Sequence, residues 1–284
     1  MPSLIDIRRR IKSVKNTQQI TKAMKMVAAA RLRKAQDRVI SSRPFARMTD
    51  ELLRNVAAAA IGGGEFEHQL LAQRREEKIQ LVLITSDRGF AGGFNANLIK
   101  AAQQFLDDHR GKTEAELYGK KGRDHFRSRD VAVSGEMTGV SERPTVEQAN
   151  ELAGKLIRRF SDAEVDSVYL IYNEFKSVLS QKVVVKKILP VEVPEGDATR
   201  EYIYEQPPAQ LLSALLPQYA QLQIIQAFLE SAAAEHAARM TAMDAATSNA
   251  SEVIDKLTLY MNRVRQASIT KEIIEVVSGA AALE

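Results

Sequence analysis

The sequence predicts an α/β domain between two long terminal helices, and three observations lead to this fold class. Neither glycine nor proline interrupts residues 3–43, and neither occurs between Pro217 and Gly279. The residues between these segments change from helical spacing to short apolar runs that alternate with helices, as in a parallel sheet. Both terminal segments carry apolar stripes that need a partner. We therefore expect an α/β plus coiled-coil protein, in which a long antiparallel helical hairpin flanks a Rossmann-like α/β domain.

The expected division has three parts. Residues 1–60 form an N-terminal coiled-coil helix, residues 75–195 form the α/β domain, and residues 208–284 form a C-terminal coiled-coil helix that pairs with 1–60. In the first part, apolar residues are spaced by three or four and resume after a polar stretch at 17–19; they are Leu4, Ile7, Ile11, Val14, Ile20, Met24 and Val27. We expect this helix to pause near Arg43–Pro44 and to end in the glycine-rich stretch at 61–64.

The middle of the chain changes its apolar period. Residues 79–85 form a short, nearly continuous apolar run, which is typical of a buried parallel strand. Further strands are expected at 114–118, 131–133, 165–172 and 182–189, with helices at 96–108, 123–127 and 145–160 between them. The last strand alternates polar and apolar residues, which suggests an antiparallel edge strand. A proline-bearing connector follows over 190–208.

The last segment returns to helical spacing. A helix over 218–278 would run roughly 90 Å, against roughly 60 Å for residues 3–43. Its apolar positions step by three or four residues; they are Ile225, Leu229, Ala232, His236, Met240, Met243, Ala246, Ala250, Ile254, Leu257, Met261 and Val264. This spacing predicts a coiled-coil seam. The tail from Arg265 to Leu283 carries apolar residues on more than one face, so we expect it to project and to need a sheath from another protein.

Charge is distributed unevenly along the chain. The net charge is +4, but residues 1–43 hold twelve basic side chains and only Asp6 and Asp37, which makes this segment +10 and the remainder −6. A basic helix favours an acidic partner, although a solvated helix face would have the same composition. No cysteine is present, which excludes disulfides and thiol chemistry. No apolar stretch is long enough to cross a bilayer, so we expect any membrane association to go through a partner.

One glycine-rich segment, residues 85–95, follows a strand and precedes a helix. That position suits phosphate binding by backbone N–H groups. However, the glycine spacing matches neither the dinucleotide motif nor a P-loop, and the P-loop lysine is missing. We therefore expect a structural turn that uses Gly89, Gly92, Gly93 and Asn95, with nucleotide binding as the alternative.

The chain shows no constellation typical of a catalytic centre. Its four histidines lack metal-ligand spacing, and no nucleophile motif is found. We expect no catalytic residue, no cofactor, no cofactor-binding residue and no metal site.

Three segments give the chain a family resemblance. They are IRRRIKSVKNTQQITKAMKMVAA at 7–29, SDRGFAGGFN at 86–95 and RQASITKEIIEVVSGA at 265–280. Together they resemble the gamma subunits of F-type ATP synthases over essentially the whole chain. One departure is Ala91, where family members often have cysteine.

The resemblance implies a central rotor stalk that transmits torque between a proton-driven membrane ring and a catalytic hexamer. Its partners would be the alpha and beta subunits, the epsilon subunit and the membrane c-ring, and ATP would be made or hydrolysed on the beta subunits. It also implies a peripheral position on the cytoplasmic face of the bacterial inner membrane. The implied contacts with the beta subunits are Lys22, Met24, Lys25, Arg239, Arg265, Gln266, Thr270, Glu272 and Glu275.

Two other interpretations stay open from the sequence. A basic coiled-coil protein that binds nucleic acid would explain the +10 segment, but not the apolar tail or the embedded α/β domain. A nucleotide-binding α/β enzyme would use the turn at 89–95.

Overall fold

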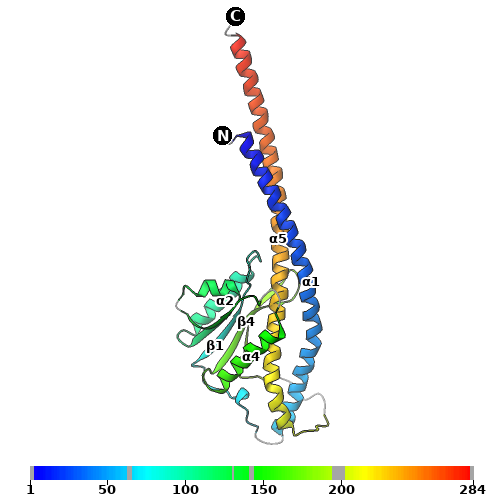
Figure 1. Cartoon of the computed structure of the whole chain (residues 1–284), viewed down its shortest axis with the longest axis vertical. Coiled ribbons are helices and arrows are strands. Elements are labelled where there is room, and N and C mark those ends of the chain that lie inside the picture. The colour runs from blue at the N-terminus through cyan, green and yellow to red at the C-terminus, as the bar shows by residue number, and fades with distance from the viewer. Residues whose placement is uncertain (1–2, 63–65, 130, 141–143, 194–201, 282–284) are drawn as a thin grey trace. The chain divides into compact units, whose positions relative to one another are not determined.

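The computed structural model describes residues 3–62, 66–129, 131–140, 144–193 and 202–281 (Figure 1). These residues form two compact units. One combines the chain ends, up to Ala28 and from Met240, and the other is Ala29–Arg239. Helices α1 (Leu4–Gly62) and α5 (Pro208–Ala281) contribute to both units. The units divide the helices rather than separating them from the sheet, so the three-part division into 1–60, 75–195 and 208–284 stays a prediction.

Within Ala29–Arg239 the elements between the two helices alternate as an α/β domain. After the short helix η1 (Gln69–Leu71), their order is β1 (Ile79–Ile84), α2 (Phe94–Asp108), β2 (Thr113–Tyr118), α3 (Lys120–Phe126), β3 (Ala132–Met137), α4 (Val146–Ser161), β4 (Ser167–Phe175) and β5 (Gln181–Leu189). The predicted strands and helices are confirmed to within a few residues. Parts of the glycine-rich break at 61–64 and of the connector at 190–208 lie outside the described residues.

The five strands form one sheet in the order β3-β2-β1-β4-β5. Strands β3, β2, β1 and β4 are parallel, and β5 pairs antiparallel with β4 at the edge, which confirms the expectation from its alternating sequence. Strand β1 lies in the middle and all six of its residues are buried. An apolar run covered on both faces is what a central parallel strand requires.

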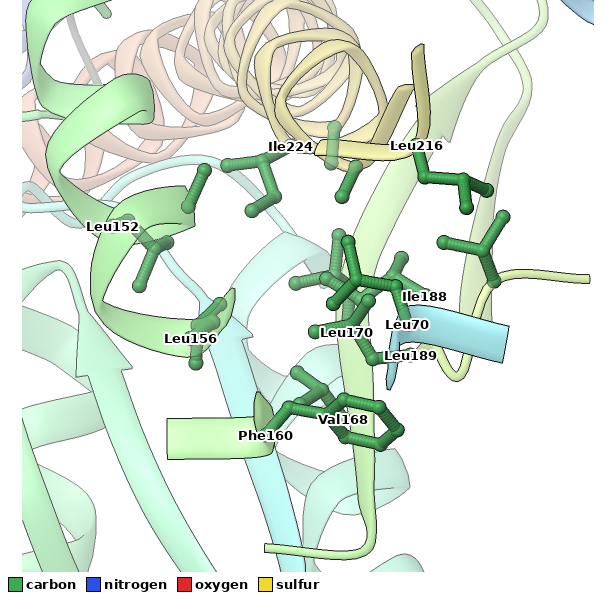
Figure 2. Close-up of a cluster of buried hydrophobic side chains, with 14 of the residues drawn as sticks. Leu70, Leu152, Leu156, Phe160, Val168, Leu170, Ile188, Leu189, Leu216 and Ile224 are labelled. Carbon is green, nitrogen blue, oxygen red and sulfur yellow. The ribbon is translucent and has the colours of Figure 1, made fainter. Parts of the chain in front are cut away.

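The main apolar core lies between the sheet, α4 and segments of the two long helices, and Figure 2 shows its members from β4, α4 and α5. Val168 and Leu170 of β4 meet Leu156 of α4 in this cluster, and α5 contributes Leu216 and Ile224. Helix α1 adds residues 53–60 to the same core. On the opposite face of β4, Tyr169 contacts Phe105 of α2, with ring centroids 5.0 Å apart. The sheet is therefore covered by helices on both faces.

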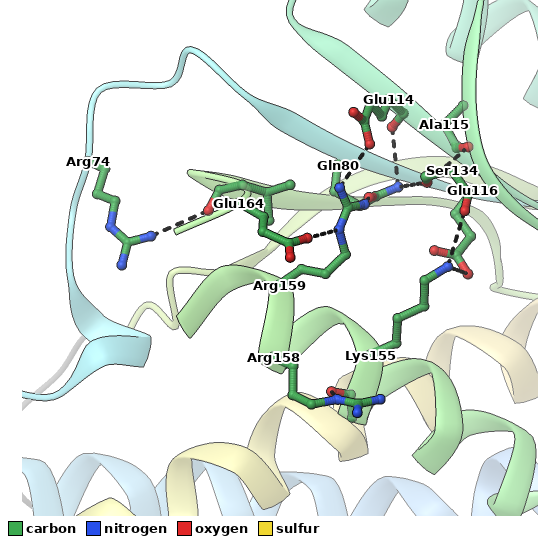
Figure 3. Close-up of polar contacts among 12 residues, drawn as sticks. Arg74, Gln80, Glu114, Ala115, Glu116, Ser134, Lys155, Arg158, Arg159 and Glu164 are labelled. Carbon is green, nitrogen blue, oxygen red and sulfur yellow. Dashed lines mark hydrogen bonds and ion pairs between the residues drawn. The ribbon is translucent and has the colours of Figure 1, made fainter. Parts of the chain in front are cut away.

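A polar layer joins α4 to strands β1 and β2 (Figure 3). Arg159 bonds the side chain of Gln80 and pairs with Glu114 and Glu164 at 2.9 Å each. Lys155 pairs with Glu116, also at 2.9 Å. Because each of these bonds has a direction, the layer fixes how α4 lies on the sheet more tightly than apolar contact alone would.

Two prolines lie inside the long helices, and the first of them corrects the predicted pause near Arg43–Pro44. Helix α1 continues through Pro44, because Val39 and Ala46 on either side of it are buried and keep the helix packed. The missing N–H of Pro44 leaves only one carbonyl of the preceding turn without its helical donor, and this part of α1 is exposed to water. Helix α5 begins at Pro208, where the expected C-terminal part also begins and ten residues before the 218–278 helix of the length estimate, and it continues through Pro217 beside the buried Leu216.

In the unit formed by the chain ends, the helices pair antiparallel along a strict seven-residue repeat. Ile7, Thr21 and Ala28 are buried on this repeat. The predicted seam positions Ile20 and Val27 are wrong, since they are 59 % and 54 % exposed. On α5 the predicted seam is confirmed: Met243 and Ala250 are buried, and Ile254, Leu257, Met261 and Val264 are half-buried. The repeat therefore determines which side faces the partner helix, even where it passes through polar residues.

Candidate functional site

The first group of predicted contact residues lies on α1 in the unit of the chain ends. Lys22 is exposed and Met24 is half-buried. Lys25 pairs with Asp244 of α5 at 2.6 Å, with 42 % and 57 % of these side chains exposed. An ion pair this exposed contributes only about 0–1 kcal/mol. The group is therefore a solvated, basic part of the helix surface.

A polar contact inside the seam lies next to this group. The hydroxyls of Thr21 and Thr247 are 2.8 Å apart, and Thr21 is buried. One hydroxyl donates to the other, and the accepting hydroxyl donates to a carbonyl of its own helix, that of Gln18 for Thr21 or of Met243 for Thr247. A polar pair at an otherwise apolar seam favours one register over its neighbours. The contact therefore sets which residues of α5 face α1.

Among the described residues of this unit, the register leaves the end of α5 without a partner helix. Thr21 lies opposite Thr247 and Lys25 opposite Asp244, so the beginning of α1 is level with about residue 264. Residues 265–281 then extend roughly 25 Å further. Five predicted contact residues, all exposed, lie on this tail: Arg265, Gln266, Thr270, Glu272 and Glu275.

Apolar side chains accompany these polar ones around the tail. Ile269, Ile273, Ile274, Val276 and Val277 are between 49 % and 72 % exposed. Two of the polar side chains make contacts within the tail: Glu272 accepts from Ser268 at 3.1 Å, and Glu275 pairs with Lys271 at 3.5 Å. A helix with apolar residues on several faces is normally covered by another protein. The two groups of predicted residues, at 22–25 and at 265–275, are separated by roughly 30 Å along α5 and do not form one site.

Arg239 differs from the other predicted contact residues, because its side chain is used inside the chain. It is 8 % exposed, pairs with Glu235 of the same helix at 2.8 Å, and donates to the carbonyl of Gly89 at 3.3 Å. This arrangement ties α5 to the turn after β1. It argues for an internal structural role rather than a contact with another subunit.

The turn after β1 is held by its own polar side chains. Asn95 accepts from the backbone N–H of Ser86 at 3.0 Å. Asp87 accepts from the N–H groups of Lys120 at 3.1 Å and Gly139 at 3.0 Å. Gly92 has a φ of 54°, whereas Gly89 and Gly93 have no such requirement. Because both acceptors are satisfied by backbone donors, the geometry favours a structural turn over a nucleotide site.

Neither a metal site nor a membrane-spanning helix is found among the described residues. Among the described residues, no group of three or more acidic or histidine side chains could hold a metal ion. In the same part of the chain, no helix has the length and apolar character that a membrane span requires.

Sequence reasoning missed three residues that bond across elements: Asp244, Thr247 and Glu230. Of these, only Thr247 had a signal, its place in the seven-residue repeat.

The comparisons with known proteins agree with this arrangement. The family model described as ATP synthase matches residues 3–283. The ATP synthase gamma chain of Solibacter usitatus is 60 % identical, and that of Pelotomaculum thermopropionicum is 50 % identical, each over 100 % of both chains. The chain belongs to the ATP synthase gamma-chain family.

Solved structures with chains similar to this one are structures of ATP synthases. The Tetrahymena thermophila mitochondrial ATP synthase central stalk and c-ring structure contains a chain 25 % identical, with a TM-score of 0.61, covering 80 % of this chain and 99 % of that one. A chain in the Euglena gracilis mitochondrial OSCP/F1/c-ring structure is 20 % identical with a TM-score of 0.69, covering 99 % and 94 %. The second likeness supports the fold alone. None of these relatives supports the nucleic-acid-binding alternative.

Proposed function

We propose that this gamma chain is the central rotor shaft of an ATP synthase and does mechanical rather than chemical work. The observation that carries the proposal is the antiparallel helix pair with a tail that extends uncovered past its partner, in a chain of this family. The tail has the exposed apolar surface expected of a shaft end that another protein surrounds.

The partners follow from the same proposal. The solved relatives stand in a central stalk with a c-ring and in an OSCP/F1/c-ring assembly. By analogy, the paired helices of this chain would stand inside a ring of alpha and beta subunits, and the α/β domain would sit on the membrane c-ring and bind the epsilon subunit. ATP synthesis and hydrolysis would take place on the beta subunits. The chain would then be a peripheral protein at the cytoplasmic face of a bacterial inner membrane.

The residues of the two groups would have different tasks in this shaft. Lys22 and Lys25, beside Met24, would attract acidic loops of the beta subunits through weak, exposed charges. Weak contacts suit a surface that must release at each step of rotation. On the tail, Arg265 and Gln266 would hydrogen-bond a beta-subunit loop, and Thr270, Glu272 and Glu275 would complete that contact. Arg239 is left out of this set, because it is buried against Gly89.

Replacing Arg265 by alanine tests this assignment. Arg263 is the matched control, since it is an exposed arginine two residues earlier on the same helix. We expect Arg265→Ala to lower the ATPase turnover or the yield of the complex with alpha and beta subunits by about tenfold, because a hydrogen bond to a charged group is lost. Arg263→Ala should stay within about twofold of wild type. Normal assembly and an unchanged rate for Arg265→Ala would contradict the proposed contact.

The nucleic-acid alternative is tested with the same purified chain. A gel shift with DNA or RNA that persists at physiological salt would favour that alternative. A stable complex with alpha and beta subunits, together with raised ATPase activity, would favour the shaft.

A further inference from the structure

A junction at the carboxyl end of β4 joins three elements of the Ala29–Arg239 unit. Pairing of β4 with β1 ends at Ile171, whereas pairing with β5 continues to Phe175. The backbone of Phe175 is bonded by side chains from the two long helices. Its N–H donates to Glu230 of α5 at 2.9 Å, and its carbonyl accepts from Arg43 of α1 at 3.0 Å.

The two side chains also pair with each other, which closes the junction. Arg43 and Glu230 are 3.2 Å apart, and they bond through the carboxylate oxygen that Phe175 does not use. The Glu230 side chain is 14 % exposed and that of Arg43 is 43 % exposed. One carboxylate therefore holds a strand and a second helix at the same time, and both of its oxygens are occupied.

A second contact lies at the same edge of the sheet. Strands β1 and β4 are parallel neighbours, so the turn after β1 and the end of β4 are at one edge. Arg239 reaches the carbonyl of Gly89 there, nine residues along α5 from Glu230, or roughly 13 Å. Helix α5 is therefore bonded to the sheet's carboxyl edge at two separate points.

The two points differ from the apolar core in how they resist motion. Apolar contacts have little directional preference, so a helix can turn slightly against them at small cost. Charge-assisted hydrogen bonds to backbone groups are directional, and turning the helix breaks them. Two such points on one helix resist rotation about its axis as well as sliding along it.

We propose that Arg43 and Glu230 are positioning residues that pass torque between the sheet and the paired helices, an inference that rests on the proposed shaft function. Their role is to keep the α/β domain and the helices turning together. When the junction opens, the domain turns partly without the helices, so that ATP is hydrolysed with less ion transport.

The test uses the whole ATP synthase in inverted membrane vesicles that carry Glu230→Ala. We expect the ratio of ATP-driven proton pumping to ATP hydrolysis to fall at least about twofold, a change typical for residues that couple distant sites. ATP hydrolysis by the detached soluble complex should be unchanged. In the same complex, hydrogen exchange at the Phe175 amide should be about tenfold faster, because its charged acceptor is gone.

Three further variants complete the test. Glu230→Gln keeps an acceptor for Phe175 but loses the charge facing Arg43, so its ratio should lie between those of wild type and Glu230→Ala. If Glu230→Ala does not assemble, Arg43→Gln tests the same junction. The Arg43 side chain is half-exposed, so replacing it does not open the apolar core. Glu77→Gln is the control: it removes an exposed ion pair with Arg75, 3.6 Å long, in the same unit and should change nothing.

The outcomes separate the two proposals. An unchanged pumping ratio in a variant whose Phe175 amide exchanges faster would overturn the junction's role and leave the shaft intact. If vesicles that lack this chain pumped protons as well as wild-type vesicles, the proposed shaft function itself would be overturned.

Discussion

Replacing Arg159 by methionine tests whether the polar layer between α4 and the sheet holds α4 in place. Methionine keeps much of the side-chain volume but none of the five donors of arginine. The change leaves Gln80, which is fully buried, and the carboxylate of Glu114 without their shared donor. Burial alone would lower the pKa of Arg159, but bonds to Glu114 and Glu164 outweigh it and raise the pKa. The charged form is therefore the one that the fold stabilises.

The expected loss follows from the exposure of each partner. The bond to the buried Gln80 involves a charged donor and contributes roughly 1.5–2 kcal/mol. Glu114 and Glu164 are 47 % and 56 % exposed, so solvent reduces their share to about 0.5 kcal/mol each. The free energy of unfolding should fall by about 2–3 kcal/mol, which corresponds to a midpoint lower by roughly 5–10 °C.

Urea denaturation of the purified chain, followed by circular dichroism, measures this loss. Arg158→Met is the matched control, because the exposed Arg158 bonds only the carbonyl of Gly154 in its own helix, at 3.2 Å. It should lie within about 0.5 kcal/mol of wild type. If Arg159→Met were equally neutral, or if both variants lost the same stability, the polar layer would not hold α4.

Three other changes test separate features. Burial lowers the pKa of His68 below 6.5, so the stability it contributes is present above about pH 6.5 and lost as the pH falls through the lowered value. His68→Asn keeps an acceptor for the cap of η1 and should reduce that acid slope in denaturation curves; an unchanged slope would contradict this. Gly119→Ala should destabilise the chain by at least about 2 kcal/mol more than Gly139→Ala in urea denaturation. Both glycines have a positive φ, but only at Gly119 would a Cβ clash with a carbonyl oxygen, that of Thr85. Equal losses would refute the clash. Thr21→Val combined with Thr247→Val should be neutral or stabilising by up to about 1 kcal/mol, because the two bonded hydroxyls leave together; a loss of more than about 1 kcal/mol would argue against this account.

The elements themselves were predictable because each has a local pattern. The apolar run of β1 predicted a buried parallel strand, and the alternation of β5 predicted an antiparallel edge strand; both are found in the sheet. Proline was the misleading signal. The preference of residues before Pro44 and Pro217 for a non-helical backbone is small, and tertiary packing on both sides of each proline outweighs it.

The sites were predictable only where a local motif carried them. Ile20 and Val27 were assigned to the seam for their hydrophobicity, whereas the seven-residue repeat places Thr21 there. The junction of Arg43 with Glu230 joins residues 187 positions apart, and no spacing along the chain connects them. The burial of Arg239 likewise depends on how α5 meets the turn at Gly89. Contacts of this kind arise from packing, which a single sequence does not display.

Because the first and last helices share their buried surfaces, the main apolar core cannot close until most of the chain has been made. Residues 53–60 of α1 belong to a core that also needs residues 212–228 of α5. At ordinary rates of synthesis, the α5 residues leave the ribosome roughly 10–30 s after the α1 residues. During that interval the apolar stripe of the basic helix α1 is exposed to solvent and can bind other proteins. The newly made chain therefore exposes this apolar surface for longer than a domain that folds from its beginning.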